Sequence, residues 1–328
     1  MIEFEPTSTD AAVAWHRGDP FTEARALVAG DALVDLSHYG VIRVSGADRR
    51  EWLHLLVTQA VDQIAPGQSC HALILSAQGH IEYDLKVVAA SDCLWLITEP
   101  ETADALTVYL ESMVFMYDVA VEDVSQTYAV FGGFTGAVAS ESVAAWTAPA
   151  AFSVPQPGQD PYVPARPAPW PATLSIVPRS AQVDAGAGMW AWESLRIAAA
   201  VPRLGLDIDH RSLPHEVGLI GSAVHLHKGC YRGQEAVART INLGRPPRRL
   251  VLLHLDGAED QLPAAGTDVR LQDSDIVVGR VGSAVQHYEQ GPLALAVVKR
   301  SAASDVDFEI AAASRAIRAG QVPVVVID

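Results

Sequence analysis

The sequence has few cysteines and no long apolar run. Its 328 residues include three cysteines, Cys70, Cys93 and Cys230, and no C-x-x-C pair. An odd number of widely spaced cysteines gives no disulfide framework, and it lacks the paired spacing of zinc or dithiol sites. No stretch approaches the roughly 18 consecutive apolar residues of a membrane span, and the N-terminus is acidic where a signal peptide is basic. We therefore expect a cytoplasmic protein with reduced thiols and no membrane contact.

Basic residues are also scarce. Lys and Arg number 23 against 39 Asp and Glu, which gives a formal net charge of −16. A charge of this sign repels nucleic acid and anionic lipid at long range. The exception is the stretch 228–249, with six basic residues and one acid. Such a run is typical either of a solvated surface or of a docking site for an anion.

Three common catalytic signatures are absent. The sequence has no G-x-x-x-x-G-K-[ST] phosphate loop, no G-x-G-x-x-G after a strand and no G-x-S-x-G nucleophile elbow. These absences give no support to a P-loop enzyme, a dinucleotide-dependent enzyme or an α/β-hydrolase.

What is present is an alternation of strand and helix patterns in the first third of the chain. A strand pattern at 40–46 leads to a helix that Asp48 can cap, and helical spacing returns over 101–113. Further strand patterns have β-branched and aromatic content and occur at 70–76, 80–90, 93–100, 118–123 and 127–133, with a turn at 77–79. This order predicts a ferredoxin-like α+β module over residues 45–125.

The middle of the chain is rich in proline. Residues 149–178 contain nine of the twenty prolines, a composition that disfavours a helix or a central strand. A disordered linker is one interpretation, but Tyr162 and Trp170 favour a partly ordered loop laid on a domain surface. An apolar stripe through Met189, Trp192 and Leu195 then predicts a helix that ends near Pro202.

The last part of the chain has the pattern of short strands separated by Gly, Pro and Asp. Only residues 311–320 interrupt this pattern, with a sequence that could form a turn of helix. Several short strands at such spacing predict a small β-barrel or sandwich, which we place at residues 243–328.

The most specific stretch is KGCYRGQE, residues 228–235. Its two glycines allow a sharp turn, Gln234 and Glu235 can brace that turn, and Lys228 and Arg232 favour the thiolate form of Cys230. Cys230 is therefore a candidate reactive group, with a small buried side chain in a tight turn as the alternative. His225 and His227 with Cys230 offer a weaker alternative, a metal site, and we predict no metal there.

This stretch and its continuation VARTINLGRPPRRLV resemble the K-G-C-Y-x-G-Q-E signature of the YgfZ family of folate-binding proteins, relatives of the glycine-cleavage T-protein. QGHIEYDLKV, WESLRIAAAVPRLGLDID and VVGRVGSAVQ follow in the family order. The resemblance implies an α+β fold of three domains in a ring around a central hole. It also implies that residues 1–44 and 126–242 form one discontinuous, folate-binding domain, and that tetrahydrofolate binds facing the hole.

The resemblance also suggests site residues. Asp84, five positions after Gly79, is similar to the T-protein aspartate near the reactive folate nitrogens, and we expect Asp84 and Cys230 to face one cavity. Arg196 matches the family arginine, which either orients a carboxylate or pairs with a neighbouring acid. Ala198 stands where T-proteins have a pterin-binding glutamate, and Glu193 lies some 140° around the helix from it.

Other positions complete the predicted folate site. Glu216 could approach from a loop in place of the missing glutamate, or it is an ordinary loop acid. Lys228, Tyr231 and Arg232 are assigned to folate as a charge, an aromatic face and a second charge, and the basic run could attract the acidic glutamate tail of a folate.

Three functions stay open at this point. The first, implied by the resemblance, is a monomeric tetrahydrofolate-binding accessory protein that supports iron–sulfur cluster assembly or repair in client proteins. The second is a folate-dependent aminomethyl or methyl transferase of the T-protein type, with Asp84 as its charged group. The third is a tRNA-binding protein that uses the Arg-rich stretch, an interpretation that the net charge disfavours.

Overall fold

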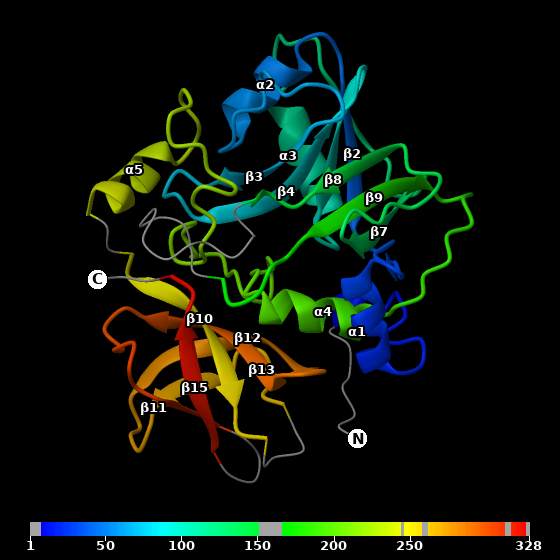
Figure 1. Cartoon of the computed structure of the whole chain (residues 1–328). Coiled ribbons are helices and arrows are strands. Elements are labelled where there is room, and N and C mark those ends of the chain that lie inside the picture. The colour runs from blue at the N-terminus through cyan, green and yellow to red at the C-terminus, as the bar shows by residue number, and fades with distance from the viewer. Residues whose placement is uncertain (1–7, 151–165, 244–245, 258–261, 312–315, 326–328) are drawn as a thin grey trace.

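The computed structural model describes residues 8–150, 166–243, 246–257, 262–311 and 316–325. These residues form two open antiparallel sheets, one closed barrel and five α-helices, and Figure 1 shows α4 between the barrel and the open sheets. Tyr162 and Arg245 lie outside the described residues.

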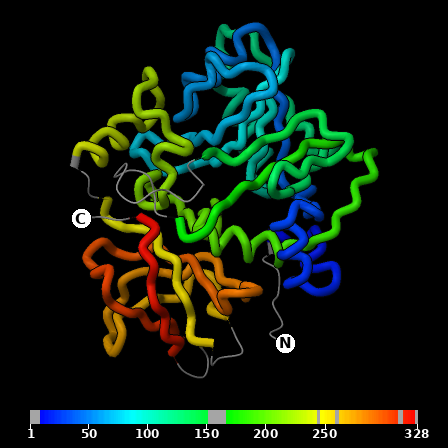
Figure 2. Tube along the Cα trace, viewed as in Figure 1, coloured from blue at the N-terminus to red at the C-terminus, as the bar shows by residue number. Residues whose placement is uncertain are grey.

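The first sheet is built from strands that lie far apart in the sequence. Its order is β1-β7-β9-β8, with bounds Val34–Asp35, Tyr128–Phe134, Ala172–Pro178 and Ala144–Thr147. The helices η1 (Ser8–Asp10), α1 (Pro20–Ala29) and α4 (Met189–Ala198) belong to the same region. Figure 2 shows the N-terminal segment beside the segment that carries α4. Asp19 caps α1 by accepting a hydrogen bond from the Phe21 amide.

The second sheet has the order β3-β4-β5-β2-β6. Its strands are β2 (Gly40–Ser45), β3 (Ser69–Leu75), β4 (Ile81–Ala89), β5 (Cys93–Thr98) and β6 (Ala120–Asp123), and its helices are α2 (Arg49–Leu56) and α3 (Ala103–Ser112). This is a ferredoxin-like arrangement with β3 added at one edge. Since β2 begins at Gly40, we propose that this module starts about five residues before the predicted position 45.

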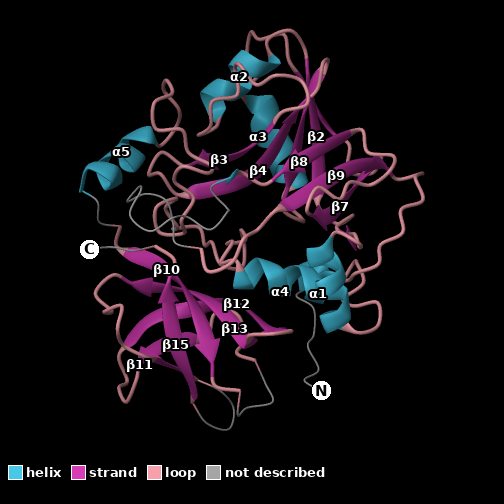
Figure 3. Ribbon diagram, in the orientation of Figure 1, coloured by secondary structure: helices cyan, strands magenta, loops and turns pink. Residues whose placement is uncertain are grey.

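The barrel closes in the order β10-β13-β12-β11-β14-β15. Its strands are Arg248–Leu255, Gly291–Lys299, Val277–His287, Asp268–Leu271, Phe308–Ile310 and Ile317–Pro323, and Figure 3 shows them wrapped into one layer. An apolar cluster joins the barrel to α4 and includes Trp190, Ile197, Leu252 and Val285. The barrel therefore sits on α4 mainly through apolar contacts.

Four local expectations were wrong. Residues 172–178 form β9, an interior strand, because the prolines of this stretch stand at or outside its ends and leave the hydrogen-bonding interior free. Residues 234–243, part of the basic stretch 228–249 for which no helix was predicted, form the helix α5. Ile317 begins β15 rather than continuing a turn of helix. The Asp48 carboxylate accepts a hydrogen bond from the Asp118 amide and makes no capping bond to α2.

Candidate functional site

A cavity of about 50 Å³ lies among α4, the first sheet and the second sheet. One part of its lining is apolar and aromatic, consisting of Leu36, Tyr39, Trp146, Trp170, Ala172, Leu174, Trp192, Val201 and Pro202. The other part is charged or titratable, consisting of His71, Asp84, Lys86, Glu99, Arg196 and Arg203. An aromatic wall that faces buried ionic groups is typical of a ligand site.

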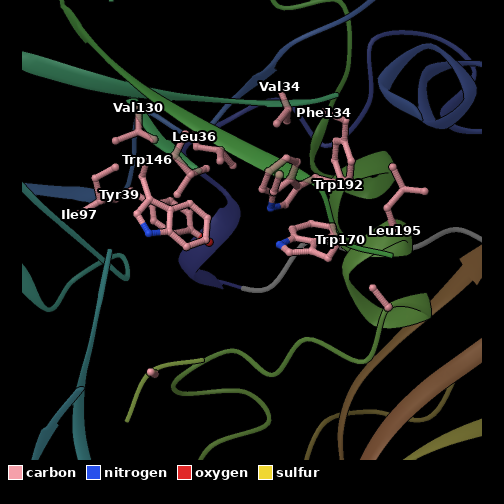
Figure 4. Close-up of a cluster of buried hydrophobic side chains, with 14 of the residues drawn as sticks. Val34, Leu36, Tyr39, Ile97, Val130, Phe134, Trp146, Trp170, Trp192 and Leu195 are labelled. Atoms are coloured by element: carbon pink, nitrogen blue, oxygen red, sulfur yellow. The ribbon is translucent and has the colours of Figure 1, made fainter. Parts of the chain in front are cut away.

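The aromatic wall is a cluster of rings packed edge to face. Trp170 lies 4.8 Å from Trp192 and 4.9 Å from Phe134, measured between ring centroids, and Figure 4 shows this group together with Trp146. Trp146 donates from its indole nitrogen to the carbonyl of Cys70 at 2.9 Å, which ties β8 to β3. Trp170 is only 5% exposed, so the prediction that it packs on the protein is confirmed.

The charged or titratable part of the lining, called the charged floor below, begins on two neighbouring strands. Side chains alternate along β4, so Asp84 and Lys86 share a face, and the strand register places His71 of β3 opposite Lys86. The Asp84 carboxylate contacts His71 Nε2 at 2.8 Å and Lys86 Nζ at 2.9 Å. Lys86 also contacts Glu99, just after β5, at 3.2 Å.

These contacts fix the charge state of Asp84. Burial alone would raise the pKa of its carboxyl, but the charges of His71 and Lys86, together with their hydrogen bonds, hold that pKa well below its usual range. Asp84 is therefore a carboxylate at neutral pH whose charge is already balanced by its neighbours. Such a group is a weak base and contributes little uncompensated negative charge to the cavity.

Arg203 connects the floor to the N-terminus of the chain. Its guanidinium donates to both oxygens of Asp10, at 2.7 and 2.9 Å, and to Glu99 at 2.8 Å. The same guanidinium lies over the ring of Tyr39, 5.5 Å from its centroid. Asp10 also contacts His38 at 3.0 Å. The segment that begins at η1 thus closes one end of the ionic network.

Arg196 is the second arginine of the floor and comes from α4. It donates to both carboxylate oxygens of Glu193, at 2.9 and 2.6 Å, to Asp207 at 2.8 Å and to the hydroxyl of Ser283 at 2.6 Å. Burial would lower the pKa of Arg196, but Glu193 and Asp207 raise it further above its usual value. Arg196 therefore pairs with neighbouring acids and also lines the cavity.

The acid on the cavity side of α4 is Glu193. Its carboxylate is bound to Arg196 and lies 3.6 Å from Arg203, and both arginines line the cavity. Ala198 instead packs in the apolar cluster against the barrel. The two positions lie on different faces of the helix, and Glu193 contacts the two arginines of the cavity without being among the residues that line it.

Glu216 does not line the cavity. It is 1% exposed, accepts from Arg248 at 2.8 and 3.0 Å, and accepts from the Leu213 amide at 3.0 Å. Arg248 also donates to Asp209 at 2.9 Å. Glu216 therefore binds Arg248, the first residue of the first barrel strand, and neither Arg248 nor Leu213 lines the cavity.

Lys228 has a structural environment. Its ammonium group donates to the carbonyls of His54, Val57 and Gln59 at the C-terminal end of α2, an arrangement that satisfies otherwise unpaired carbonyls. Burial nevertheless lowers the pKa of Lys228 to about 8. It also lies 5.3 Å from the centroid of the Tyr231 ring. Lys228 thereby fastens the loop at 228–235 to the second sheet's helix.

The rest of that loop leads into α5, and Gln234 braces the turn as expected. Gln234 accepts from the Tyr231 amide at 3.2 Å, and Arg232 pairs with Glu82 at 3.0 Å in solvent. Gly233 has a φ of +84°, and a Cβ there would lie 2.5 Å from the Ser76 carbonyl, so only glycine fits against the 76–79 turn.

Cys230 is exposed, and the cavity lining is formed by other described residues. The expected convergence of Asp84 and Cys230 on one cavity is therefore not what the lining shows. Burial raises the pKa of the Cys70 thiol to about 12, and Cys93 is buried. His225 and His227 have ring centroids 6.4 Å apart, and within the described ranges no three His, Cys, Asp or Glu side chains form a metal-binding group.

The basic run is largely occupied by internal contacts. Lys228, Arg232 and Arg248 are bound as described, and Arg249 donates to the carbonyl of Ala302 at 3.0 Å and to Gln321 at 2.8 Å. Arg239 is exposed. Among the described basic residues of this run, four are therefore engaged in contacts within the protein.

Several site residues were missed by sequence reasoning, namely Asp10, His71, Lys86, Glu99, Arg203 and Asp207. Only Lys86 had a local signal, because it follows Asp84 by two positions on a predicted strand. Asp10 and Arg203 are 193 positions apart, and no periodicity connects them.

Part of the chain matches a known protein family. Residues 11–156 match the family model described as the GCVT N-terminal domain. A putative chloroplastic transferase of Arabidopsis thaliana is 25% identical over 262 residues, which cover 70% of this chain and 58% of that protein. An aminomethyltransferase of Synechococcus sp. (strain CC9902) is 27% identical over 276 residues, covering 72% of this chain and 71% of that one.

The fold is similar to a solved structure. Glycine cleavage system aminomethyltransferase T from Bartonella henselae superposes with a TM-score of 0.68 at 17% identity, covering 95% of this chain and 93% of that chain. Among the described residues no helix is long and apolar enough to span a membrane. The comparisons thus show a match of residues 11–156 to the GCVT N-terminal domain model, and the chain as a whole has the α+β fold of a T-protein with a C-terminal six-stranded barrel.

Proposed function

We propose that this chain binds tetrahydrofolate in the cavity between α4 and the two open sheets. The observation that carries the proposal is the combination of three lining tryptophans with a set of charged and titratable side chains on the other side of the cavity. A pterin is a flat ring system with hydrogen-bond donors and acceptors along its edge, so it suits a site that offers ring faces on one side and ions on the other.

Different residues of the cavity contact different parts of the pterin. Trp170 and Trp192 supply aromatic surface, the carboxylates of Glu99 and Asp84 accept from pterin N–H groups, and Arg203 donates to its carbonyl. The network has five carboxylates (Asp10, Asp84, Glu99, Glu193, Asp207) and three permanent cations (Lys86, Arg196, Arg203). This excess favours ring N–H donors and disfavours the acidic tail, which is therefore directed toward solvent. When bound, the folate supplies a pair of nitrogens that carry a one-carbon unit.

The cavity must widen to accept this ligand. Its volume of about 50 Å³ holds one or two water molecules. Pockets for small molecules are usually about 300–1,000 Å³. Binding therefore requires side chains of the aromatic wall to move, and the intrinsic fluorescence of the tryptophans should change with the ligand.

The fixed charge of Asp84 supports an accessory role over transferase chemistry. A transferase of the second type needs a group that stabilises positive charge developing on the folate, and Asp84 is already engaged by the imidazole of His71 at 2.8 Å and by the Lys86 ammonium at 2.9 Å. We therefore propose a monomeric, folate-binding accessory protein for iron–sulfur cluster assembly or repair. The resemblance of KGCYRGQE supplies the iron–sulfur part, and the exposed Cys230 is its candidate contact with client proteins.

Calorimetric titration with tetrahydrofolate and folinate tests the binding proposal. We expect saturable binding by the wild type, and about tenfold or more weakening in Asp84→Asn and Trp192→Leu, since each removes one anchoring contact worth roughly 1.5–3 kcal/mol. Asp104→Asn, an exposed acid on α3, is the matched control and should bind normally. Absence of heat and of fluorescence change in the wild type would end the proposal.

A second assay separates the two roles. Purified protein is incubated with tetrahydrofolate and aminomethyl or methylamine donors, and methylenetetrahydrofolate is measured. The accessory role predicts no turnover, together with loss of iron–sulfur enzyme activity in cells that carry Cys230→Ser in place of the wild type. Turnover that disappears in Asp84→Asn would instead establish the transferase.

A further inference from the structure

The barrel contributes one side chain to the ionic network behind the cavity. Ser283, on β12, accepts from Arg196 Nη2 at 2.6 Å, and its hydroxyl lies 2.9 and 3.0 Å from the two oxygens of Asp207. Its amide donates to Asp207 at 2.8 Å. All three residues are buried. The contact therefore joins two domains through charged, desolvated hydrogen bonds, which are stronger than neutral ones.

The backbone of β12 is shaped for this approach. The pairing of β12 with β13 shifts register between Val281 and Ala284, which takes residues 282 and 283 out of the regular ladder. A Cβ at Gly282 would lie 2.3 Å from Asp207 Oδ1, so glycine is needed for the carboxylate to reach the Ser283 amide. A bulge that aims a side chain at a site is a recurrent device next to ligand pockets.

Asp207 connects Ser283 to both arginines of the charged floor. Its Oδ2 accepts from Arg196 Nη1 at 2.8 Å and from the Arg203 backbone amide at 3.0 Å. Arg196 and Arg203 both line the cavity. Ser283 itself does not line it, so any effect of Ser283 on a ligand must act through these two side chains.

We propose that Ser283 is a positioning residue for the ligand site, so that ligand affinity and the seating of the barrel on α4 are thermodynamically linked. The inference rests on the proposed function. By reciprocity, a ligand that fixes Arg196 tightens the contact at Ser283, and a barrel that holds Ser283 in place improves ligand affinity by the same factor.

The test uses the full chain and tetrahydrofolate as the probe. Ser283→Ala removes the hydroxyl but keeps the amide bond to Asp207 and the apolar cluster that seats the barrel. We expect about twofold to thirtyfold weaker binding by calorimetry, the range of coupling seen for residues without ligand contact. Ser301→Ala, an exposed serine of the same barrel, is the matched control and should bind like the wild type.

Two further readouts separate positioning from a loss of stability. Amide exchange of residues 281–285 should slow when tetrahydrofolate binds the wild type, and this response should shrink in Ser283→Ala. A double-mutant cycle with Arg196→Lys should be non-additive, because both changes act on one contact. If Ser283→Ala does not fold, Ser283→Cys, of nearly the same size, takes its place.

The outcomes are distinct. If the wild type binds and Ser283→Ala binds equally well, with additive behaviour in the cycle and unchanged exchange, the inference is wrong and the proposed function stands. If the wild type binds no folate, the proposed function falls, and the coupling to folate falls with it.

Discussion

Replacing Arg203 with Met measures how much the buried ionic network contributes to the fold. Arg203 is 3% exposed and is the shared cation of Asp10 and Glu99. Methionine occupies a similar volume but removes that cation from two buried carboxylates. Breaking a buried ion pair from one side costs about 3–5 kcal/mol. Since 1 kcal/mol corresponds to about 2–4 °C in a large domain, the melting temperature should fall by roughly 6–20 °C.

The assay is thermal unfolding followed by calorimetry and near-UV circular dichroism, with a matched control. Arg232→Met removes an ion pair of similar length, 3.0 Å to Glu82, but one in solvent, so its cost should stay below about 1 kcal/mol. Adding Asp10→Asn and Glu99→Gln to Arg203→Met should recover part of the loss, because the stranded charges are removed. A melting temperature for Arg203→Met within about 2 °C of wild type would refute the reasoning, as would an equal loss in the control.

Three further predictions concern single side chains. Burial lowers the pKa of His215 to about 4, below the roughly 6.5 of an unfolded chain, so the folded state keeps a neutral imidazole. The contribution of this shift to the free energy of unfolding is complete above pH 6.5. Up to about 3 kcal/mol of it is lost as the pH falls to 4. His215→Phe should flatten the melting temperature between pH 7 and 4.5, and an unchanged slope would contradict this. Lys228→Met should cost about 1–3 kcal/mol by leaving the α2 carbonyls unpaired, and amide exchange should quicken across 53–59; exchange like that of the wild type would show that the cap is dispensable. Native protein should show one fast thiol toward a disulfide reagent, absent in Cys230→Ser, because Cys70 and Cys93 are buried or half-buried; two fast thiols in the wild type would disprove the assignment.

Local patterns predicted the parts of the fold that depend on local chemistry. Alternation of side chains and the turn at 77–79 indicated the strands around Asp84, and helical spacing indicated α3. β9 was missed because proline content was averaged over 149–178, whereas strand formation depends on which amides the prolines remove. No helix was predicted for α5, although Val237 and Ile241 stand one helical turn apart in this segment.

Site residues could be predicted only where they lie within one recognisable short stretch of sequence. Asp84 and Arg196 were suggested by the family resemblance of the short stretches that contain them, and both line the cavity. The cation that joins Asp10 to Glu99 lies far from both in sequence, so its place follows from tertiary packing alone. The side of α4 that packs on the barrel, where Ala198 lies, is likewise set by tertiary packing.

The most direct test is a crystal structure of the protein grown with tetrahydrofolate. It should show a flat bicyclic ring against Trp170 and Trp192, with its edge toward Glu99, Asp84 and Arg203, and with the aromatic wall moved outward. Density for the ring beside the exposed loop of Cys230, or an unchanged cavity of about 50 Å³ at saturating ligand, would contradict the account.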